Sequence, residues 1–463
     1  MHKAILITLI AVVCLVAITV SILTWNIHHQ PSDGPSSWPR NLKLLRWSPG
    51  SNWTLDQATA GVICTGATNS GKTSGPYQYA IRSFLRAGFG GLFLVAKNDA
   101  TSEYIDLIRS EDRESDLIVF SPDTPGQGFN FLTYEANQSG SDKAIVENLV
   151  QLLMQAVEIS ARQRRNQGHD WFEDAMRTLL RHCLLVSLIA TGKPDIGLVL
   201  EMVQSLPQNL GDVEEPERFR SLQLLADAEA KATPERAYEL QMARRYIAWE
   251  WPTLSDRTRS SIAISLSTPL DVMLRWPLRK MFLEELTVSP EDPLAGRLVV
   301  IAAPVKRYDL IGKISGVIWK YSLQRAIERR PEIANGLPVE LIRPTVISGD
   351  EAQFFSSQSD AHFQMTARSA RGITLYATQS TPNFYAEMGG DPTSKARVDS
   401  LLANLQTRLA CQNLDPETNR WYSEKLGQRV GQTACPVGDR QSKWRRTAGE
   451  ACWSQPFRQH ERI

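Results

Sequence analysis

The stretch GATNSGKT, at residues 66–73, constrains the fold of this chain more than any other feature. It fits the pattern GxxxxGK[ST], follows the short apolar run AGVIC (60–64) and precedes a segment with helical spacing at 72–87. Two glycines let successive backbone N–H groups turn inward, and the following helix adds the positive end of its dipole. The stretch therefore predicts a strand–loop–helix unit whose loop cradles a phosphate group.

Each part of this loop has an expected role in holding a nucleotide. The Lys72 ammonium can reach the β- and γ-phosphates, and the Thr73 hydroxyl can ligate Mg²⁺. The predicted ligands are therefore ATP and Mg²⁺. The predicted nucleotide-binding residues are Gly66, Ala67, Thr68, Asn69, Ser70, Gly71, Lys72, Thr73 and Ser74.

The segment TVISGDEAQFF (345–355) supplies the acids that such a site needs. Asp350 and Glu351 directly follow an apolar strand, and we expect Asp350 to hold the magnesium ion through its water shell. Glu351 is expected to polarise the attacking water as a general base, which favours hydrolysis over passive nucleotide binding. Gln379 ends the apolar run GITLYATQ, where its amide can hydrogen-bond the γ-phosphate or the attacking water.

Two arginines, Arg368 and Arg371, precede the strand that ends at Gln379. A guanidinium can neutralise charge on a transferred phosphoryl group, often across a subunit boundary. We prefer Arg368 for this role and keep Arg371 as the second choice. Either arginine can instead be an ordinary surface residue at a helix end.

Short apolar runs indicate a largely parallel sheet that is covered on both faces. The region from about 145 to 265 has helical spacing only, so an all-helical domain interrupts the α/β domain. The predicted strands lie at 60–64, 90–96, 116–122, 297–304, 344–351, 372–379 and 404–412. The predicted division is a linker at 26–55, a nucleotide-binding domain at 56–144 and 266–435, an all-α domain at 145–265 and a basic tail at 436–463.

The N-terminal segment AILITLIAVVCLVAITVSILTW, at residues 4–25, carries no charge. As a helix it would span about 33 Å, enough to cross a hydrocarbon core of about 30 Å. The run is longer than the apolar region of a cleaved signal peptide, so we expect a retained anchor within residues 1–25. The positive residues that follow it place the rest of the chain in the cytoplasm.

The formal net charge of +1 argues against a surface that is basic throughout, so contact with nucleic acid would come from local patches. Two clusters combine basic residues with a tryptophan, a pairing that suits single strands because bases stack while the charges follow the backbone. A solvated helix face or a basic tail end is the alternative, and we prefer it for each cluster. The candidate DNA-binding residues are Arg162, Arg164, Arg165, Lys443, Arg445 and Arg446.

Several further segments, in order along residues 60–430, resemble the type IV secretion coupling proteins. These are the TraG/TraD-type conjugative DNA-transfer ATPases of the FtsK/HerA-like P-loop motor superfamily. The matching segments are DLIVFSPDTPGQGFNFL with Phe120, Pro122 and Asn130, RTRSSIAISLSTPLDVM (257–273), ISGDEAQFF, ITLYATQS, and NLDPETNRWYSEKLGQR with Asp415, Thr418, Ser423 and Gly427. In place of the family's Asp-x-Lys this chain reads AKNDA, which leaves Lys97 and Asp99 without an assigned role.

The resemblance implies an α/β, RecA-like P-loop domain in a homohexameric ATPase. It also implies a protein anchored in the bacterial inner membrane with its ATPase domain in the cytoplasm. Many relatives have two membrane helices, whereas this chain shows only the segment 4–25, so the expected protein is single-pass. Such proteins recruit a relaxase–DNA complex and drive single-stranded DNA through a type IV secretion channel. A coupling ATPase for protein effectors and a nucleotide-dependent adaptor without motor activity are the alternative functions.

Overall fold

The computed structural model describes residues 37–124, 126–138, 144–161, 170–333 and 336–426. The predicted membrane anchor and basic tail lie outside these residues, as do all six candidate DNA-binding residues. Within the described ranges, no helix combines the length and the apolar character needed to span a bilayer.

Seven parallel strands form the central sheet, in the order β5-β6-β4-β7-β8-β3-β9. Every strand overlaps one of the seven predicted runs, so the expected parallel α/β sheet is confirmed. The strands are β3 (Val62–Thr65), β4 (Gly90–Leu94), β5 (Leu117–Phe120), β6 (Leu298–Ile301), β7 (Thr345–Gly349), β8 (Gly372–Thr378) and β9 (Thr407–Ala410).

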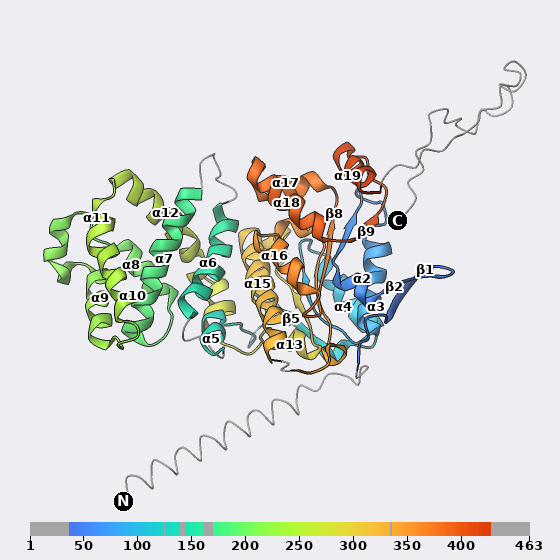
Figure 1. The fold of residues 1–463 in the computed structure, drawn as a ribbon, viewed down its shortest axis with the longest axis horizontal. Coiled ribbons are helices and arrows are strands. Elements are labelled where there is room, and N and C mark those ends of the chain that lie inside the picture. Colours follow the sequence, from blue (N-terminus) through green and yellow to red (C-terminus); the bar gives the residue numbers. More distant parts are fainter. Residues whose placement is uncertain (1–36, 125, 139–143, 162–169, 334–335, 427–463) are drawn as a thin grey trace, which may run out of the picture.

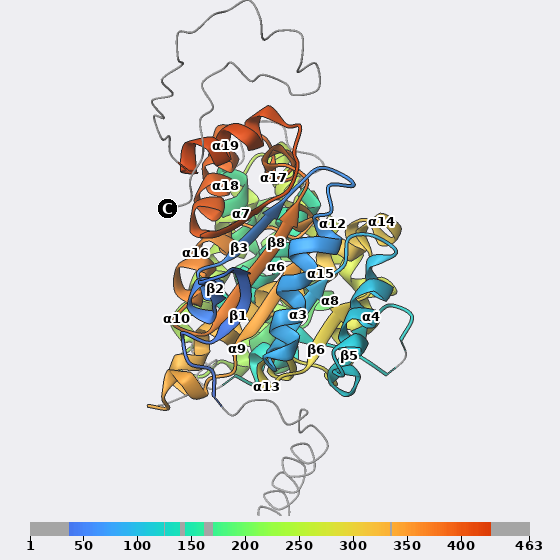
Figure 2. The ribbon, with the colours of Figure 1, turned by 90° about the vertical axis from the view of Figure 1, so that its right-hand side faces the viewer.

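Successive side chains of each strand point to opposite faces, and each face has its own hydrophobic core. On β3, Val62 and Cys64 pack on one face and Ile63 on the other. The first face is covered by α3 (Gln78–Arg86) and α4 (Ala100–Ser110). The second face is covered by α15 (Leu310–Ile333), α16 (Ser359–Ala367) and α18 (Pro392–Asn404). Figure 2 shows α3 and α4 together on one side of the strands.

The described residues between β5 and β6 contain no strand, and most of them form a helical region on one side of the sheet (Figure 1). Helix α6 packs against α15 and joins this region to the helical layer over the sheet. Helix α12 runs through the expected domain boundary at residue 265, so the return to the sheet begins later than the sequence indicated. The helices of the region are α6 (Ile145–Ala161), α7 (Asp170–Thr191), α8 (Ile196–Gln204), α9 (Arg220–Lys231), α10 (Ala237–Arg245), α11 (Trp251–Thr253) and α12 (Asp256–Leu274).

Several short helices complete the α/β part of the chain. Helix α5 follows β5, α13 and α14 flank β6, and α17 and α19 lie near the carboxyl ends of β8 and β9. Their bounds are α5 (Phe131–Ala136), α13 (Glu291–Ala295), α14 (Val305–Tyr308), α17 (Thr381–Met388) and α19 (Pro416–Leu426).

The expected linker at 26–55 is wrong over its second half. Strands β1 (Lys43–Ser48) and β2 (Ser51–Thr54) form an antiparallel hairpin that leads into α2 (Leu55–Thr59). The Trp53 side chain is buried, and its ring centroid lies 5.6 Å from that of Phe84 in α3. Burying this large aromatic side chain holds the hairpin on the α/β domain.

Candidate active site

The GATNSGKT loop connects β3 to the first turn of the next helix and is anchored by the neighbouring strands. The Gly66 amide donates to the Thr378 carbonyl at 3.3 Å, and the Ala67 amide donates to the Gln412 carbonyl at 2.9 Å. A Cβ on Gly66 would lie 2.4 Å from the Ser70 Oγ, so the loop can close only with glycine there. The expected strand–loop–helix unit is therefore present.

The predicted helix at 72–87 is interrupted near its start. A π-helical turn spans Thr73–Tyr77, and α3 begins only at Gln78. Gly75 has a non-helical conformation, and Pro76 cannot donate a backbone hydrogen bond. The kink at this pair separates the phosphate-binding turn from the helix that packs on the sheet.

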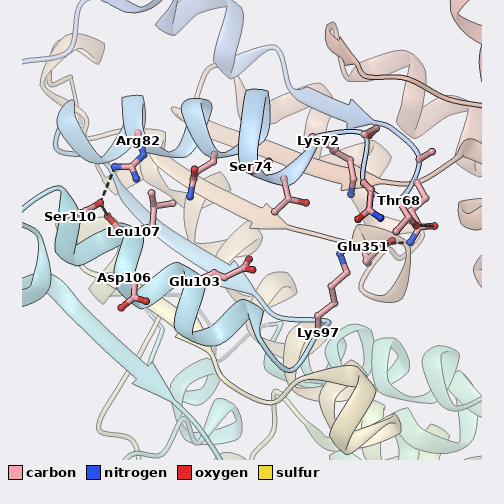
Figure 3. A pocket seen from close by; sticks show the side chains of 17 residues that line it. Thr68, Lys72, Ser74, Arg82, Lys97, Glu103, Asp106, Leu107, Ser110 and Glu351 are labelled. Carbon is pink, nitrogen blue, oxygen red and sulfur yellow. Dashed lines mark hydrogen bonds and ion pairs between the residues drawn. The ribbon is translucent and has the colours of Figure 1, made fainter.

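A pocket of about 690 Å³ opens beside the loop and continues between α3 and α4 (Figure 3). Eight of the nine predicted nucleotide-binding residues line it, and the ninth, Gly66, lies against Ser70 of the same loop. The lining consists of residues 67–74 together with Gln78, Arg82, Lys97, Glu103, Asp106, Leu107, Ser110, Glu351 and Gln379.

The predicted magnesium residues lie together at the end of the loop. The Lys72 Nζ is 2.9 Å from the Asp350 Oδ1, and the Thr73 Oγ1 donates to the Asp350 Oδ2 at 3.4 Å. A hydroxyl and a carboxylate are the hard oxygen ligands that Mg²⁺ prefers, so these residues fit the ion. Burial raises the pKa of Asp350, but the ammonium groups of Lys72 and Lys97 outweigh it and lower this pKa below its usual value.

Glu351 is buried, and three donors hold its carboxylate. The Gln379 Nε2 donates to Oε1 at 3.0 Å, and the Gln353 Nε2 donates to Oε2 at 2.9 Å. The Lys97 Nζ lies 3.3 Å from Oε1 and also 3.1 Å from the Asp350 Oδ2. The structure thus brings the predicted base and the predicted glutamine into direct contact beside the phosphate loop.

Sequence reasoning gave no role to two of these donors, Lys97 and Gln353. Lys97 follows β4, which neighbours β7, so its position at the carboxyl edge of the sheet was available as a signal. Gln353 lies only two residues after Glu351, and its contact depends on a local turn. Glu351 itself has a left-handed backbone with φ of +54°, which starts this turn.

The late Asp-x-x-Thr segment supports Gln379 and does not line the pocket. The Asn413 Nδ2 donates to the Gln379 carbonyl at 2.7 Å. Asp415 caps α19 by accepting from the Thr418 amide at 2.7 Å, and the Thr418 hydroxyl accepts from the Thr381 amide at 2.9 Å. Through these bonds the chain after β9 fixes the loop that carries Gln379.

The structure places Arg368 and Arg371 away from this pocket, at the amino end of β8. Gln379 follows the carboxyl end of the same strand, about 20 Å away for seven extended residues. The Arg371 side chain is buried and its Nε donates to the Val339 carbonyl at 3.1 Å. The Arg368 side chain is 53% exposed and pairs with Asp56 at 2.7 Å. Neither side chain therefore reaches the pocket of its own chain, and Arg368 is the more exposed of the two.

No protein-family model matches the chain, and no curated protein sequence is significantly similar to it. The fold, however, is similar to solved structures of the plasmid coupling protein TrwB. A complex of TrwBdeltaN70 with sulphate gives a TM-score of 0.55 at 17% identity, and the match covers 84% of this chain and 79% of that one. A complex with ADP and Mg²⁺ gives a TM-score of 0.52 at 17% identity, and the match covers 84% of this chain and 79% of that one. A complex with the ATP analogue ADPNP gives 0.54 at 16% identity, with 86% of each chain covered. The chain therefore has the fold of a conjugative coupling protein, as its motifs indicated.

Proposed function

We propose that this chain is a coupling ATPase that drives single-stranded DNA through a type IV secretion channel during bacterial conjugation. The observation that carries the proposal is Glu351, a buried carboxylate beside the phosphate loop that contacts Gln379 at 3.0 Å. A protein that only binds nucleotide needs no carboxylate at this position. The fold shared with TrwB, whose structures contain ADP and Mg²⁺ or ADPNP, supports the same assignment.

The residues of the pocket can perform hydrolysis in one step. Glu351 accepts a proton from a water molecule while the water oxygen attacks the γ-phosphorus and the bond to the β-phosphate oxygen breaks. Gln379 orients the water, and Lys72 neutralises charge on the phosphate oxygens. Thr73 and Asp350 would hold Mg²⁺, which would neutralise further negative charge on the phosphate oxygens when bound.

The finer parts of the proposal concern assembly and location. We infer a homohexamer anchored in the inner membrane through residues 4–25, with the ATPase domain in the cytoplasm. Its substrate is a relaxase–DNA complex, and its partners are the proteins of the secretion channel. The uncharged N-terminal segment supports the anchor, and the exposed Arg368 is consistent with a residue that acts on a neighbouring subunit.

The full-length protein in lipid nanodiscs tests the DNA motor directly. We expect single-stranded DNA to bind and to stimulate ATP turnover, with a strong dependence on salt. Turnover without any response to DNA would exclude the DNA motor and favour protein effectors as the substrate. DNA transfer that continues in cells with Glu351→Gln would exclude a motor altogether and favour a recruiting adaptor.

A further inference from the structure

A second cavity, of about 270 Å³, lies on the other side of Glu351. Lys97, Glu351 and Gln379 line both this cavity and the nucleotide pocket, so they form a shared wall. The second cavity also contains Lys306 and Asn383, which do not line the nucleotide pocket. A group that leaves the γ-phosphate position past Glu351 therefore enters a separate space that the proposed hydrolysis does not use.

The donors of this second cavity suit an anion. Lys306 is exposed and has no carboxylate within 4 Å among the residues described by the structure, and its Nζ lies 5.3 Å from the Phe354 ring centroid. Lys97, which also pairs with Asp350 and Glu351, adds a second ammonium. Among the described residues, no side-chain hydrogen bond engages the amide of Asn383. The two acids in the lining are each paired, Glu351 with Lys97 and Glu387 with Lys313 at 3.0 Å.

Gln353 lines this cavity and carries a buried acceptor that requires a hydrogen-bond donor. Gln353 is 4% exposed, and its Nε2 is directed to the Glu351 carboxylate, which leaves Oε1 to accept a hydrogen bond. This oxygen is buried and has no hydrogen-bond partner among the described residues. A buried acceptor in this state has lost its hydrogen bond to water without gaining another, which is unfavourable. Hydrogenphosphate carries one P–OH group that can donate to it, whereas the γ-phosphate of ATP carries none at neutral pH.

We propose that this second cavity binds the inorganic phosphate released by hydrolysis and forms its exit route. The proposal rests on the hydrolysis proposed above. Water adds to the γ-phosphorus and ADP leaves, so that one water proton goes to Glu351 and the other remains on phosphate as the P–OH group. Lys97 and Lys306 then bind the phosphate oxygens, Gln353 accepts from the P–OH group, and the nucleotide pocket still holds ADP.

Lys306→Met in the full-length protein is the central variant. Rapid-quench measurements report ATP cleavage, and a fluorescent phosphate-binding protein reports phosphate release in the same time range. In this variant, phosphate that leaves the nucleotide pocket no longer gains a charge-assisted hydrogen bond in the second cavity. We therefore expect phosphate release to slow about tenfold, while ATP cleavage changes less than about twofold. Lys306→Arg should restore release. Arg307→Met is the matched control, since Arg307 lies on the same short helix α14 but does not line the cavity.

A binding measurement separates this inference from the hydrolysis on which it rests. Radiolabelled phosphate should bind the wild-type protein in the presence of Mg·ADP, and Lys306→Met and Asn383→Asp should each weaken binding about tenfold. If the wild-type protein cleaves no ATP but binds phosphate in this way, the proposed ATPase activity is refuted and the phosphate site still stands. Unchanged release and phosphate binding in Lys306→Met would overturn the inference, and so would a loss of ATP cleavage itself in this variant.

Discussion

Glu351 combines two features that seldom occur together in a residue with only a structural role. Its backbone has φ of +54°, a conformation that residues other than glycine adopt at a cost, and its carboxylate is buried. The turn persists because Gln379, Gln353 and Lys97 all bind the carboxylate. The surrounding side chains thus hold a strained acid in one orientation, which is what a positioned general base requires.

Glu351→Gln is expected to lower ATP turnover by about 10²–10⁴-fold, because the amide cannot accept the proton of the attacking water. Nucleotide binding should be retained, since Lys72 and the loop backbone are untouched. Turnover is measured by phosphate production and binding with a fluorescent ATP analogue. Glu424→Gln, at an exposed position on α19, is the control. Turnover above a tenth of the wild-type value would remove Glu351 from the role of base.

A second buried acid, Asp360, has a structural role on the face of the sheet that α15 and α16 cover. It pairs with the buried Lys320 and accepts from the Gln324 Nε2 at 2.9 Å and from the Ser357 amide at 3.1 Å. Asp360→Asn removes the carboxylate that balances a buried ammonium group, so we expect a loss of about 3–5 kcal/mol. Thermal denaturation measures this loss.

The double variant Lys320→Met with Asp360→Leu tests whether the charge imbalance is the cause. Removing both charges should recover much of the lost stability, because a buried ion pair contributes little beyond apolar side chains of similar volume. His362→Gln, at an exposed position on the same helix α16, is the control. A double variant that is less stable than Asp360→Asn would contradict this explanation.

At the scale of elements, α7 carries a histidine that makes the helical region sensitive to acid. The His182 ring centroid lies 4.8 Å from that of Tyr246, and its buried Nδ1 has no hydrogen-bond partner in the part of the chain that the structure describes. Burial, with a smaller contribution from Arg181, lowers the pKa of His182 to about 4. The ordinary value is about 6.5, so the unfolded chain binds more protons than the folded chain between these values. The contribution of His182 to the free energy of unfolding is therefore fully present above pH 6.5 and is lost as the pH drops toward 4.

Acidification from pH 7 to pH 5 should cost the helical region about 1–2 kcal/mol through this residue. His182→Phe keeps an aromatic ring against Tyr246 and removes the titrating group, so the difference between the two pH values should shrink by that amount. Thermal denaturation followed by circular dichroism at each pH measures the effect. His362→Gln, which changes an exposed histidine, should leave the wild-type pH dependence intact.

The elements themselves were predictable to different degrees, for physical reasons. Strands such as β4 and β7 are buried on both faces and appear as continuous apolar runs, a local signal. The hairpin β1–β2 was missed because its sequence KLLRWSPGSNWT is largely exposed and polar. It is held by one buried side chain, Trp53, on α3. Contacts of this kind depend on a distant partner that no local pattern reports.

At the scale of the whole molecule, the site also divides into parts with a local sequence signal and parts that depend on distant contacts. The loop, Asp350, Glu351 and Gln379 were predictable because parallel strands bring their carboxyl ends to one edge of the sheet. The donation from Gln353 to Glu351 was not, since it follows from a left-handed turn at a non-glycine residue. The second cavity likewise forms where α14 and α17 meet the loop after β7, and its residues are far apart in the chain.

The position of Arg368 makes its role a question about the assembly and not about one subunit. It lies at the amino end of β8, about a full strand length from Gln379 in its own chain. Among the described residues, its exposed side chain makes only a surface ion pair with Asp56, which costs little to break. In the proposed hexamer, a guanidinium in this state would be free to leave Asp56 and reach the nucleotide of an adjacent subunit. Arg371, which is buried and bonded to Val339, cannot do so without local unfolding.

Mixed assemblies test this role of Arg368. Arg368→Ala and Lys72→Ala should each abolish turnover, by about 10³-fold or more for a lost arginine finger. If Arg368 acts in trans, random mixing of the two variants places an intact pocket beside an intact arginine at about a quarter of the subunit boundaries, and turnover returns in proportion. Mixing Lys72→Ala with Glu351→Gln should restore nothing, because both changes disable the same pocket. No recovery in the first mixture, with oligomers shown by mass photometry to be mixed, would exclude Arg368 as the residue that completes a neighbouring site.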